Sequence, residues 1–493
     1  LDSYYAEAAK RESDPRARAL DAIRNTMIRV RGSYALGILF GDQPGVIYAA
    51  RKDSPLILGR CDGEYQGHMI ASDVPAVLNY TRNVVYIDNQ EIACLTRDEL
   101  HVYNIDCEEI EKPFVEIKWD AAAAEKDGYE HFMMKEIHEQ PRAVRDTLSP
   151  RIKENESGER YIDLSETGLT DEDFAAVSRV YLIGCGSAYH VGMAARYVLE
   201  KAARVPCEVD LASEFRYRDP ILEESGLVII ISQSGETADS LAALRLCKER
   251  GVRTLAVVNV VGSSIAREAD SVIYTWAGPE IAVATTKAYS TQLAALYLIA
   301  VHMAEVRGQI TPARREALID AMLALPDQIE RVLSDKERVQ WYANKMAACK
   351  DVFFIGRGLD YAISMEGSLK LKEISYIHSE AYAAGELKHG TISLIEDGVL
   401  VVAVATQPEL FEKEVSNMVE VRSRGASLFG LTTYGQYAIE DTVNFTVYVP
   451  RTDPLLATSL AVVPLQLLAY YISCAKGLDV DKPRNLAKSV TVE

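Results

Sequence analysis

The chain has 493 residues, of which 48% are hydrophobic and 25% are charged, values typical of a globular protein of roughly two to four domains. Its formal net charge of −19 argues against a surface that binds nucleic acid or an anionic membrane. We expect no membrane span, because we expect no apolar stretch to reach the roughly 20 uncharged residues that a span needs. We also expect no secretion signal at the N-terminus. Any phosphate must therefore be held locally, by loops and helix ends.

The cysteines indicate a reducing compartment. None of the eight forms a CxxC pair, and none lies near a histidine at the spacing of a metal site. We therefore expect a cytoplasmic protein without a metal site built from these cysteines. The eight are Cys61, Cys94, Cys107, Cys185, Cys207, Cys247, Cys349 and Cys474.

Residues 1–112 are predicted to be α+β. A helix-like opening leads into short apolar runs interrupted by turn residues such as Gly41-Asp42 and Asp88-Asn89, which favours strands joined by short hairpins. Residues 113–150 contain an Ala-rich turn and a polar helical segment, and are predicted to be a linker that packs against another part of the chain. The apolar runs are 33–40, 45–52, 68–72, 84–95 and 100–105, the turn is 121–128, and the helical segment is 131–148.

From about residue 175 onward, buried-strand patterns alternate with helical lengths. Near-continuous Val, Ile and Leu runs end in Gly-rich turns at 179–187, 226–237 and 254–264. Such runs, separated by helices, indicate parallel strands covered on both faces.

The second half of the chain repeats this pattern. The segment VYLIGCG at 180–186 aligns with VFFIGRG at 352–358 at an offset of 172 residues. The next strands, which begin at Gly226 and Gly398, are aligned at the same offset, and the third pair at an offset of 174, from Gly251 to Gly425. Two α/β domains of one fold, in tandem, are predicted.

A candidate phosphate site follows the second of these strands. Residues 231–237 (ISQSGET) end a buried strand and open a helix, where backbone N–H groups and the helix dipole favour an anion. Ser232, Ser234 and Thr237 add hydroxyls there. Gln233 adds an amide, and Gly235 lets the backbone approach closely. The pattern is that of a phosphate cradle without Lys or Arg; an ordinary helix N-cap is the alternative.

The turn after the first strand, GCGSAYH at 184–190, has a weaker signal. Its GxGxxY pattern is only superficially a dinucleotide fingerprint, because Tyr189 replaces the third glycine. Ser187 adds a further donor if the turn lies beside the cradle; a glycine turn for tight packing is the alternative. The second copy reads VATQPEL at 404–410 and has lost the hydroxyls, so we expect one phosphate site per chain.

The second copy instead carries a polar helical stripe. Glu366, Lys370 and Glu373 are spaced i, i+4, i+7 and fall within roughly 60° on a helix. Apolar sequence flanks them, and a carboxylate–lysine–carboxylate stripe in such surroundings is suited to moving protons. A solvated surface ion pair is the alternative. Further on, His389 borders a glycine turn, and Lys488 lies in a Pro-anchored, strand-like tail that reaches a site if it folds back.

At this point the sequence resembles the glutamine–fructose-6-phosphate aminotransferase family, whose isomerase half consists of two sugar-isomerase (SIS) domains. The matching strings are CGSAYHVGM, ASEFRYRDP, SQSGETADSLAALR, EIAVATTKAYSTQL, EGSLKLKEISYIHSEAYAAGELKHG and PRNLAKSVTVE, with RGSYALGIL, SPLILG and ASD nearer the start. The resemblance implies an α/β chain with parallel sheets in α/β/α layers, preceded by a partial α+β glutaminase domain of the Ntn type. The predicted organisation is the rear of that domain at 1–112, the linker at 113–150, SIS domains at 151–310 and 311–480, and an active-site tail at 481–493.

The resemblance implies a role for each candidate residue. Lys488 would attack the C2 carbonyl of open-chain fructose 6-phosphate as a Schiff-base amine, and Glu373 would move a proton between C1 and C2. His389, reaching into a neighbouring subunit's site, would help to open the ring, assisted by Glu366 and Lys370. This implies a homodimer with a shared site, and the implied reaction needs no metal and no redox cofactor. The implied contacts to the phosphosugar are Ser187, Ser232, Gln233, Ser234, Thr237, Val283 and Ala284.

The sequence also departs from the family. Members often have Ser at Ala188 and Thr285 and Pro at Thr391, which puts the nearby sugar contacts in question. The family's N-terminal Cys nucleophile, its Arg-Trp-Ala-Thr-His loop and its Asn-Gly oxyanion site do not occur here, since the chain starts at Leu1. We expect glutamine to be used only through a missing amino-terminal part.

Three functions are consistent with these features. The first is synthesis of glucosamine 6-phosphate from fructose 6-phosphate and glutamine-derived ammonia. The second is a phosphosugar-binding regulator on the same domains, which the acidic charge and the catalytic set Glu373, His389 and Lys488 disfavour. The third is an ammonia-using sugar-phosphate isomerase or deaminase, which the glutaminase-like residues 1–112 disfavour.

Overall fold

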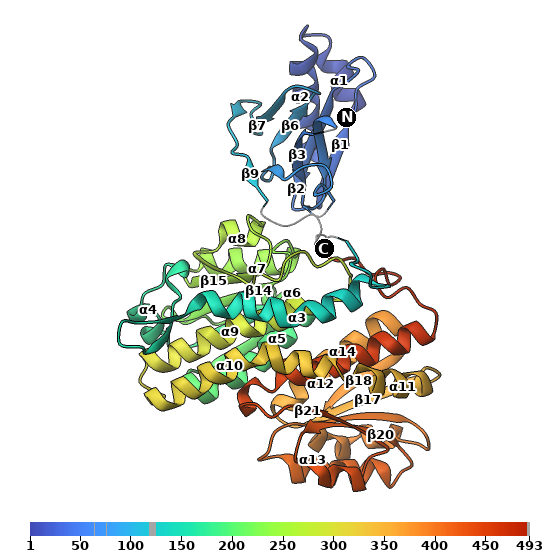
Figure 1. Ribbon diagram of the computed structural model, residues 1–493. Helices are drawn as coiled ribbons and strands as arrows, with labels where there is room; N and C mark the ends of the chain where they lie inside the picture. The colour runs from blue at the N-terminus through green and yellow to red at the C-terminus, as the bar shows by residue number, and fades with distance from the viewer. Residues whose placement is uncertain (64, 75, 118–124, 491–493) are drawn as a thin grey trace. The chain divides into compact units, whose positions relative to one another are not determined.

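The computed structural model describes residues 1–63, 65–74, 76–117 and 125–490 (Figure 1). The chain divides into two compact units. The first comprises Leu1–Glu125 with the short segments Glu236–Ala238 and Ser489–Glu493, and the second comprises Lys126–Gly235 and Asp239–Lys488.

The first unit is built from two antiparallel sheets and two helices. The sheets have the orders β1-β2-β6-β7-β8 and β4-β3-β5-β9, and every strand pair is antiparallel. One apolar cluster joins the facing sides of the sheets, and another packs helix α2 on the first sheet. The predicted α+β class is therefore confirmed. The elements are α1 (Asp2–Ala8), α2 (Pro15–Arg29), β1 (Tyr34–Ile38), β2 (Ile47–Lys52), β3 (Ile57–Asp62), β4 (Gln66–Ala71), β5 (Asn83–Tyr86), β6 (Ile92–Leu95), β7 (Leu100–Tyr103), β8 (Glu109–Ile110) and β9 (Val115–Glu116).

Two local expectations for this unit were too coarse. The helix-like opening is two helices, because Asp14 accepts backbone hydrogen bonds from Arg16 and Ala17 and Pro15 occupies the first position of α2. The apolar run 84–95 is two strands, β5 and β6, which belong to different sheets. The Asp88–Asn89 turn lies between them, so the chain leaves one sheet and enters the other there.

The first repeat of the second unit contains a five-stranded parallel sheet in the order β13-β12-β14-β15-β16. Alternate residues of its strands belong to two apolar clusters, one with α5 and α9 and the other with α6, α7 and α8. Helices therefore cover both faces, as the near-continuous apolar strands predict. The elements are α4 (Asp171–Ala176), β12 (Val180–Gly184), α5 (Ser187–Val198), β13 (Cys207–Leu211), α6 (Ala212–Phe215), β14 (Leu227–Ser232), α7 (Ala238–Glu249), β15 (Arg253–Val258), α8 (Ser264–Glu268), β16 (Ser271–Tyr274) and α9 (Lys287–Val306).

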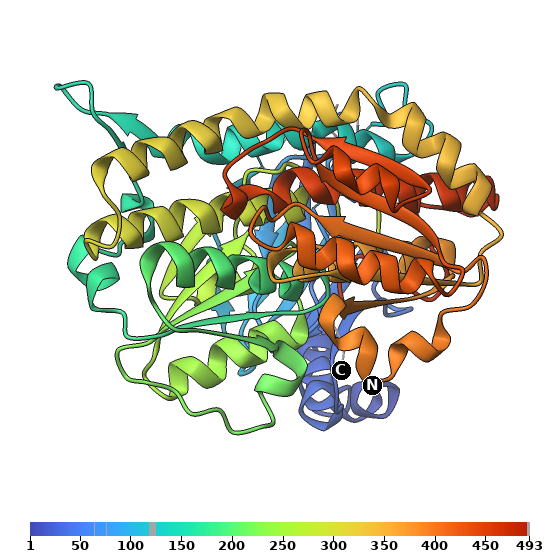
Figure 2. The ribbon, with the colours of Figure 1, turned by 90° about the horizontal axis from the view of Figure 1, so that it is seen from below.

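The same architecture then recurs. The second parallel sheet has the order β18-β17-β19-β20-β21, so both sheets read 2-1-3-4-5 in chain order. Figures 1 and 2 both place the two repeats side by side, the first in green and yellow and the second in orange and red. The elements are α11 (Lys336–Met346), β17 (Asp351–Gly356), α12 (Leu359–Ser375), β18 (His378–Ala383), η5 (Ala384–His389), β19 (Leu400–Ala405), α13 (Phe411–Arg422), β20 (Ser427–Thr433), β21 (Phe445–Val449) and α14 (Thr458–Ala475).

The register of the sheets corrects one predicted offset. Val180 pairs with Leu227 in the first sheet, and Val352 pairs with Leu400 in the second. The offset is therefore 172 for the first strand but 173 for the second, so the alignment of Gly226 with Gly398 was wrong by one residue. The offset of 174 for the third strand holds, because β15 starts at Arg253 and β20 at Ser427. The second repeat has gained one residue between β18 and β19 and one between β19 and β20, whereas the other two connections have the same length in both repeats.

One continuous apolar core links the two repeats. It takes in one face of each sheet and helices α3 (Phe132–Leu148), α9, α10 (Pro312–Leu333), α12 and α14. The segment predicted as a linker thus contains a helix that is buried in this core, and a short hairpin, β10 (Ile152–Glu154) with β11 (Arg160–Ile162), follows it. Its Ala-rich turn lies mostly outside the described residues.

The sequence-based expectation that no apolar stretch reaches about 20 uncharged residues was wrong. Pro454–Ala475 is a run of 22 uncharged residues whose most apolar 18-residue window has a mean hydropathy of 1.8, and within the described residues this is the one helical segment apolar enough to cross a membrane. All of its most apolar window is buried inside the protein. Its apolarity is accounted for by its position between α11 and α12, in the middle of the core.

Candidate active site

The predicted phosphate cradle lies at the carboxyl end of β14. Gly235 has φ +66°, and its N–H donates to the hydroxyl of Ser232 (3.0 Å). A Cβ at Gly235 would stand 2.0 Å from the hydroxyl oxygen of Ser263, so only glycine fits there. The carbonyl of Gln233 accepts from the N–H of Asn259 (3.1 Å), which holds the loop against the next strand.

The first glycine turn opens beside this loop. β12 and β14 are adjacent parallel strands, so their carboxyl ends lie at one edge of the sheet, and the chain leaves them toward different neighbours. In sheets of this kind, ligands bind at that switch point. Gly186 precedes α5 with φ 56° and ψ −126°, a backbone conformation for which glycine is needed, and Ser187 is the first residue of the helix. Thr237 directly precedes α7.

Ser187 joins the first repeat to a carboxylate of the second. Its hydroxyl donates to Glu366 Oε1 (2.9 Å), and the Nδ1 of His190 lies 2.8 Å from Glu366 Oε2. Glu366 is completely buried, so these contacts to α5 supply the polar partners that its carboxylate requires. Sequence reasoning missed His190, although it stands one turn after Ser187 on the same helix.

The predicted stripe on α12 is buried rather than solvated. The Nζ of Lys370 lies 2.5 Å from Glu373 Oε2 and 3.5 Å from Glu366 Oε1. Burial alone would lower the pKa of Lys370, but the carboxylates of Glu373 and Glu366 outweigh it and raise this pKa above its usual range. Lys370 is therefore a permanent cation between two carboxylates, of which that of Glu373 is partly accessible.

The tail brings Lys488 to a second buried carboxylate. Its Nζ lies 2.5 Å from Glu280 Oε2 and 2.9 Å from the carbonyl of Ala282. The other oxygen of Glu280 accepts from the backbone N–H groups of Thr286 (2.9 Å) and Ala288 (3.1 Å), at the start of α9. Burial would raise the pKa of Glu280, but Lys488 and these amides outweigh it and lower the pKa. Glu280 received no role from the sequence, although it opens the quoted string EIAVATTKAYSTQL.

A third carboxyl group stands behind this pair. Glu136 of α3 is buried, and its Oε1 accepts from the N–H groups of Ile281 (2.6 Å) and Ala282 (3.2 Å). Burial and the nearby carboxylate of Glu280 raise the pKa of Glu136 to about 8. Glu136 is therefore protonated at neutral pH, and its position in the predicted linker gave no sign of this.

Backbone contacts fix the tail in place. The N–H of Val283 donates to the carbonyl of Asp481 (3.0 Å), and the Asp481 carboxylate accepts from the first N–H groups of α3, those of Phe132 and Met133 (2.9 Å each). The N–H of Arg484 donates to the hydroxyl of Tyr376 (2.8 Å). The tail was predicted to be strand-like, but no strand forms over 481–490, and residues 491–493 lie outside the described residues.

The remaining predicted residues differ in placement. Ala284 is buried and Val283 half-buried in the loop between β16 and α9, next to Glu280. His389 is exposed at the end of η5, and among the described residues no hydrogen bond or ion pair joins it to Glu366, Lys370 or Lys488. Ala188 is half-buried on the first turn of α5.

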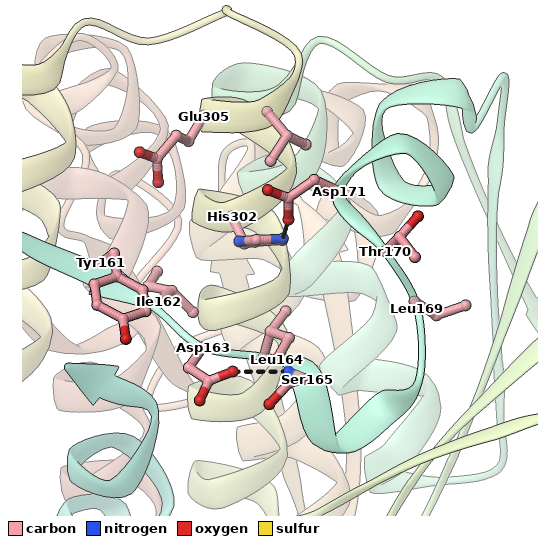
Figure 3. Close-up of a pocket in the computed structure, with 11 residues that line it drawn as sticks. Tyr161, Ile162, Asp163, Leu164, Ser165, Leu169, Thr170, Asp171, His302 and Glu305 are labelled. Atoms are coloured by element: carbon pink, nitrogen blue, oxygen red, sulfur yellow. Dashed lines mark hydrogen bonds and ion pairs between the residues drawn. The ribbon is translucent and has the colours of Figure 1, made fainter. Parts of the chain in front are cut away.

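A separate hollow of about 480 Å³ lies by the carboxyl-terminal end of α9 (Figure 3). His302 borders it, with Nε2 3.1 Å from the carboxylate of Asp171. None of the predicted site residues lines this hollow. The candidate site is therefore the cluster around Glu366, Lys370 and Lys488.

The fold and the site residues together indicate the broad class of protein. The doubly wound sheet occurs twice in tandem, and the first copy has a hydroxyl-rich loop at its switch point, an arrangement suited to binding a phosphorylated ligand. The SIS domain family model matches residues 173–302 and 345–475. The structure aligns with that of the C-terminal domain of glucosamine-fructose-6-phosphate aminotransferase from Francisella tularensis, with a TM-score of 0.69 and 38% identity over 73% of this chain and 100% of that one.

Sequence relatives narrow the class to one family. The chain is 54% identical over 474 residues to the glutamine–fructose-6-phosphate aminotransferase (isomerizing) of Caldanaerobacter subterraneus subsp. tengcongensis. It is 53% identical over 474 residues to the enzyme of that name from Clostridium acetobutylicum. Each alignment covers 96% of this chain and 77% of the relative. The chain belongs to the glutamine–fructose-6-phosphate aminotransferase family.

Proposed function

We propose that this chain makes glucosamine 6-phosphate from fructose 6-phosphate and ammonia, by amination at C2 coupled to ketose-to-aldose isomerisation. The observation that carries the proposal is the position of Lys488. An amine from the end of the chain is held 2.5 Å from a buried carboxylate, in the unit that also contains Ser232, Gln233 and Ser234 and the carboxylate–lysine–carboxylate stripe of α12. Family membership supports the same activity.

In this proposal the cradle binds the phosphate and the loop before α9 lines the sugar. Backbone N–H groups and neutral side chains suit a dianion here, because they stabilise its charge without the fixed cation of an Arg or Lys. Val283 and Ala284 present an apolar surface to the sugar chain beside the attacking amine. The phosphate ligands proposed are Ser187, Ser232, Gln233, Ser234 and Thr237.

The chemistry follows from the neighbours of each group. Lys488 attacks the C2 carbonyl of the open-chain sugar, and water leaves as the imine forms. Ammonia displaces the lysine from C2, which leaves the sugar imine and regenerates the free amine. Glu373 then removes a proton from C1 and returns one to C2, giving the aldose amine, with Lys370 holding the carboxylate in place. The balance is fructose 6-phosphate plus ammonia to glucosamine 6-phosphate plus water.

Ring opening is assigned to His389 of a second copy of this chain, in a homodimer. The exposure of His389 in one copy supports this, since an imidazole that acts in a neighbour's site must project from its own subunit. Mixing His389→Ala with Lys488→Met subunits tests it. Activity in the mixture, where each variant alone is inactive, is expected, and a mixture without activity would refute the shared site.

The proposed location is the reducing cytoplasm. The eight cysteines are free, and none is paired in a disulfide, which supports this location. A redox-sensitive reporter fused to the protein in its own cell would test it.

Imine trapping tests the function directly. The protein is incubated with fructose 6-phosphate and borohydride, and the intact mass is measured. One reduced sugar adduct per chain, mapped to Lys488, is expected, together with glucosamine 6-phosphate when ammonium is added. Lys488→Met should abolish both, whereas Lys482→Met, an exposed lysine of the same tail, should retain both. Sugar binding with neither adduct nor product would instead indicate a regulator.

A further inference from the structure

The second repeat has a buried carboxylate in the loop that corresponds to the cradle. Asp360 is 2% exposed, and its Oδ2 accepts from the N–H groups of Thr406 (2.7 Å) and Gln407 (3.2 Å). Its Oδ1 accepts from the hydroxyl of Thr406 (2.5 Å). Three donors at the carboxyl end of β19 thus converge on one internal anion.

The repeat identifies the counterparts of these residues. β12 and β17 correspond at an offset of 172, which places Asp360 on Ala188, the second residue of α5. β14 and β19 correspond at an offset of 173, which places Thr406 and Gln407 on Gln233 and Ser234 of the cradle. The first repeat therefore has a methyl group where the second has a carboxylate, and a methyl group accepts no hydrogen bond.

We propose that Asp360 is a built-in anion that occupies the phosphate cradle of the second repeat and so limits the chain to one phosphosugar. The proposal rests on the proposed function for one point only, that the first repeat's cradle binds the sugar phosphate. Burial raises the pKa of Asp360 to about 6, so the group is a carboxylate at neutral pH and can replace an anionic ligand.

A second carboxyl group lies near Asp360. Glu414 of α13 is buried, and both of its oxygens lack a hydrogen-bond partner among the described residues. Burial and the charge of Asp360 raise the pKa of Glu414 well above its usual range. The offset of 173 places Glu414 on Leu241, so the second repeat has a carboxyl group at two positions where the first is apolar.

This anion also has a positioning role. Asp360 is the second residue of α12, and it ties that end of the helix to the β19 loop, while Glu366, Lys370 and Glu373 follow on the same helix. A phosphate entering there would compete for the donors that anchor α12. An internal anion keeps the helix fixed whether or not sugar is present.

The test exchanges the residues between the repeats. In the variant Asp360→Ala with Glu414→Leu, these two positions carry the residues of the first repeat, Ala188 and Leu241. Equilibrium dialysis with radiolabelled inorganic phosphate should then show two bound phosphates per chain instead of one. A folded double variant, checked by near-UV circular dichroism, that still binds one phosphate would overturn the proposal.

The reverse exchange gives an independent result. Ala188→Asp places a carboxylate in the first cradle and should weaken binding of fructose 6-phosphate by roughly 100-fold, because like charges at close range are strongly unfavourable. Ala188→Asn, of the same size but uncharged, should weaken it far less. Equal affinity in Ala188→Asp and the parent protein would refute the proposal even where the double variant does not fold.

The two proposals fail in different ways. If the parent protein does not bind fructose 6-phosphate, the proposed function fails, and the phosphate count of the Asp360→Ala, Glu414→Leu variant still tests the internal anion. If the parent protein binds the sugar but the count stays at one, the internal anion fails alone.

Discussion

Replacing Lys370 with methionine tests whether the buried cation holds the carboxylates of α12 together. Methionine preserves most of the side-chain volume but removes the positive charge. Glu366 and Glu373 then face each other without the cation that lies 3.5 Å and 2.5 Å from them. Breaking a buried ion pair by removing one partner costs about 3–5 kcal/mol.

Two features place the expected loss near the lower end of that range. Glu366 retains its contacts with Ser187 and His190. The side chain of Glu373 is 21% exposed, so water partly solvates the charge of its carboxylate. We therefore expect Lys370→Met to lower the free energy of unfolding by about 3 kcal/mol. Product formation should be lost as well, because Glu373 is no longer held in place.

The assay is urea unfolding followed by intrinsic fluorescence, with the midpoint and slope fitted together. Lys372→Met is the matched control, because it removes an exposed lysine from the same helix. The change in this control should stay within about 0.5 kcal/mol. In the double variant with Glu373→Gln, part of the lost stability should return, since the remaining carboxylate no longer meets a second one.

A Lys370→Met protein as stable as Lys372→Met would refute the reasoning. It would mean that the two carboxylates do not need the cation, and that the stripe is not a coupled cluster. Loss of stability without recovery in the double variant would point to lost packing rather than to charge.

Three further changes test the site. Glu280→Gln keeps the shape but removes the charge that faces Lys488, and the rate of product formation should fall about 10–100-fold, as for a lost charge-assisted hydrogen bond; an unchanged rate would exclude that role for the pair. Gly235→Ala should abolish fructose 6-phosphate binding in calorimetry because its Cβ meets a neighbouring serine, whereas Gly251→Ala, with positive φ but open space, should bind normally. Because the pKa of Glu136 is raised in the folded state, that state keeps a proton that the unfolded state releases, and the stability of the parent protein falls from pH 5 to pH 8. Glu136→Gln should flatten the fall of the melting temperature over this range. Equal slopes of melting temperature against pH in the variant and the parent would contradict the raised pKa of Glu136.

The features found in the sequence are those with a local pattern. Near-continuous apolar runs revealed the central parallel strands, and the i, i+4, i+7 spacing placed three side chains on one face of α12. The edge strand β13 is half-exposed and β16 has four residues, so neither gave a run long enough to recognise. The α14 helix shows the converse, since its composition alone cannot distinguish a core helix from a membrane span.

The carboxylates behind Lys488 could not be found in this way. Glu136 meets the loop beside Glu280 across 145 residues of sequence, and each is a single glutamate in a chain with 72 acidic residues. No spacing rule connects such positions. Only the packing of α3 against the start of α9 brings them together, and that packing is decided by the core as a whole.

The tandem repeat explains why the site needs both domains. The cradle loop after β14 belongs to the first repeat, the stripe of Glu366, Lys370 and Glu373 belongs to α12 of the second, and the hydroxyl of Ser187 donates a hydrogen bond from one repeat to the other. Because the second repeat supplies α12 to a site shared with the first repeat, α12 must not shift when a ligand binds to the second repeat. The carboxylate of Asp360 meets this requirement, because it satisfies the donors of the unused cradle with an anion that never leaves. Division of labour between two copies of one fold thus depends on closing one binding site as much as on keeping the other open.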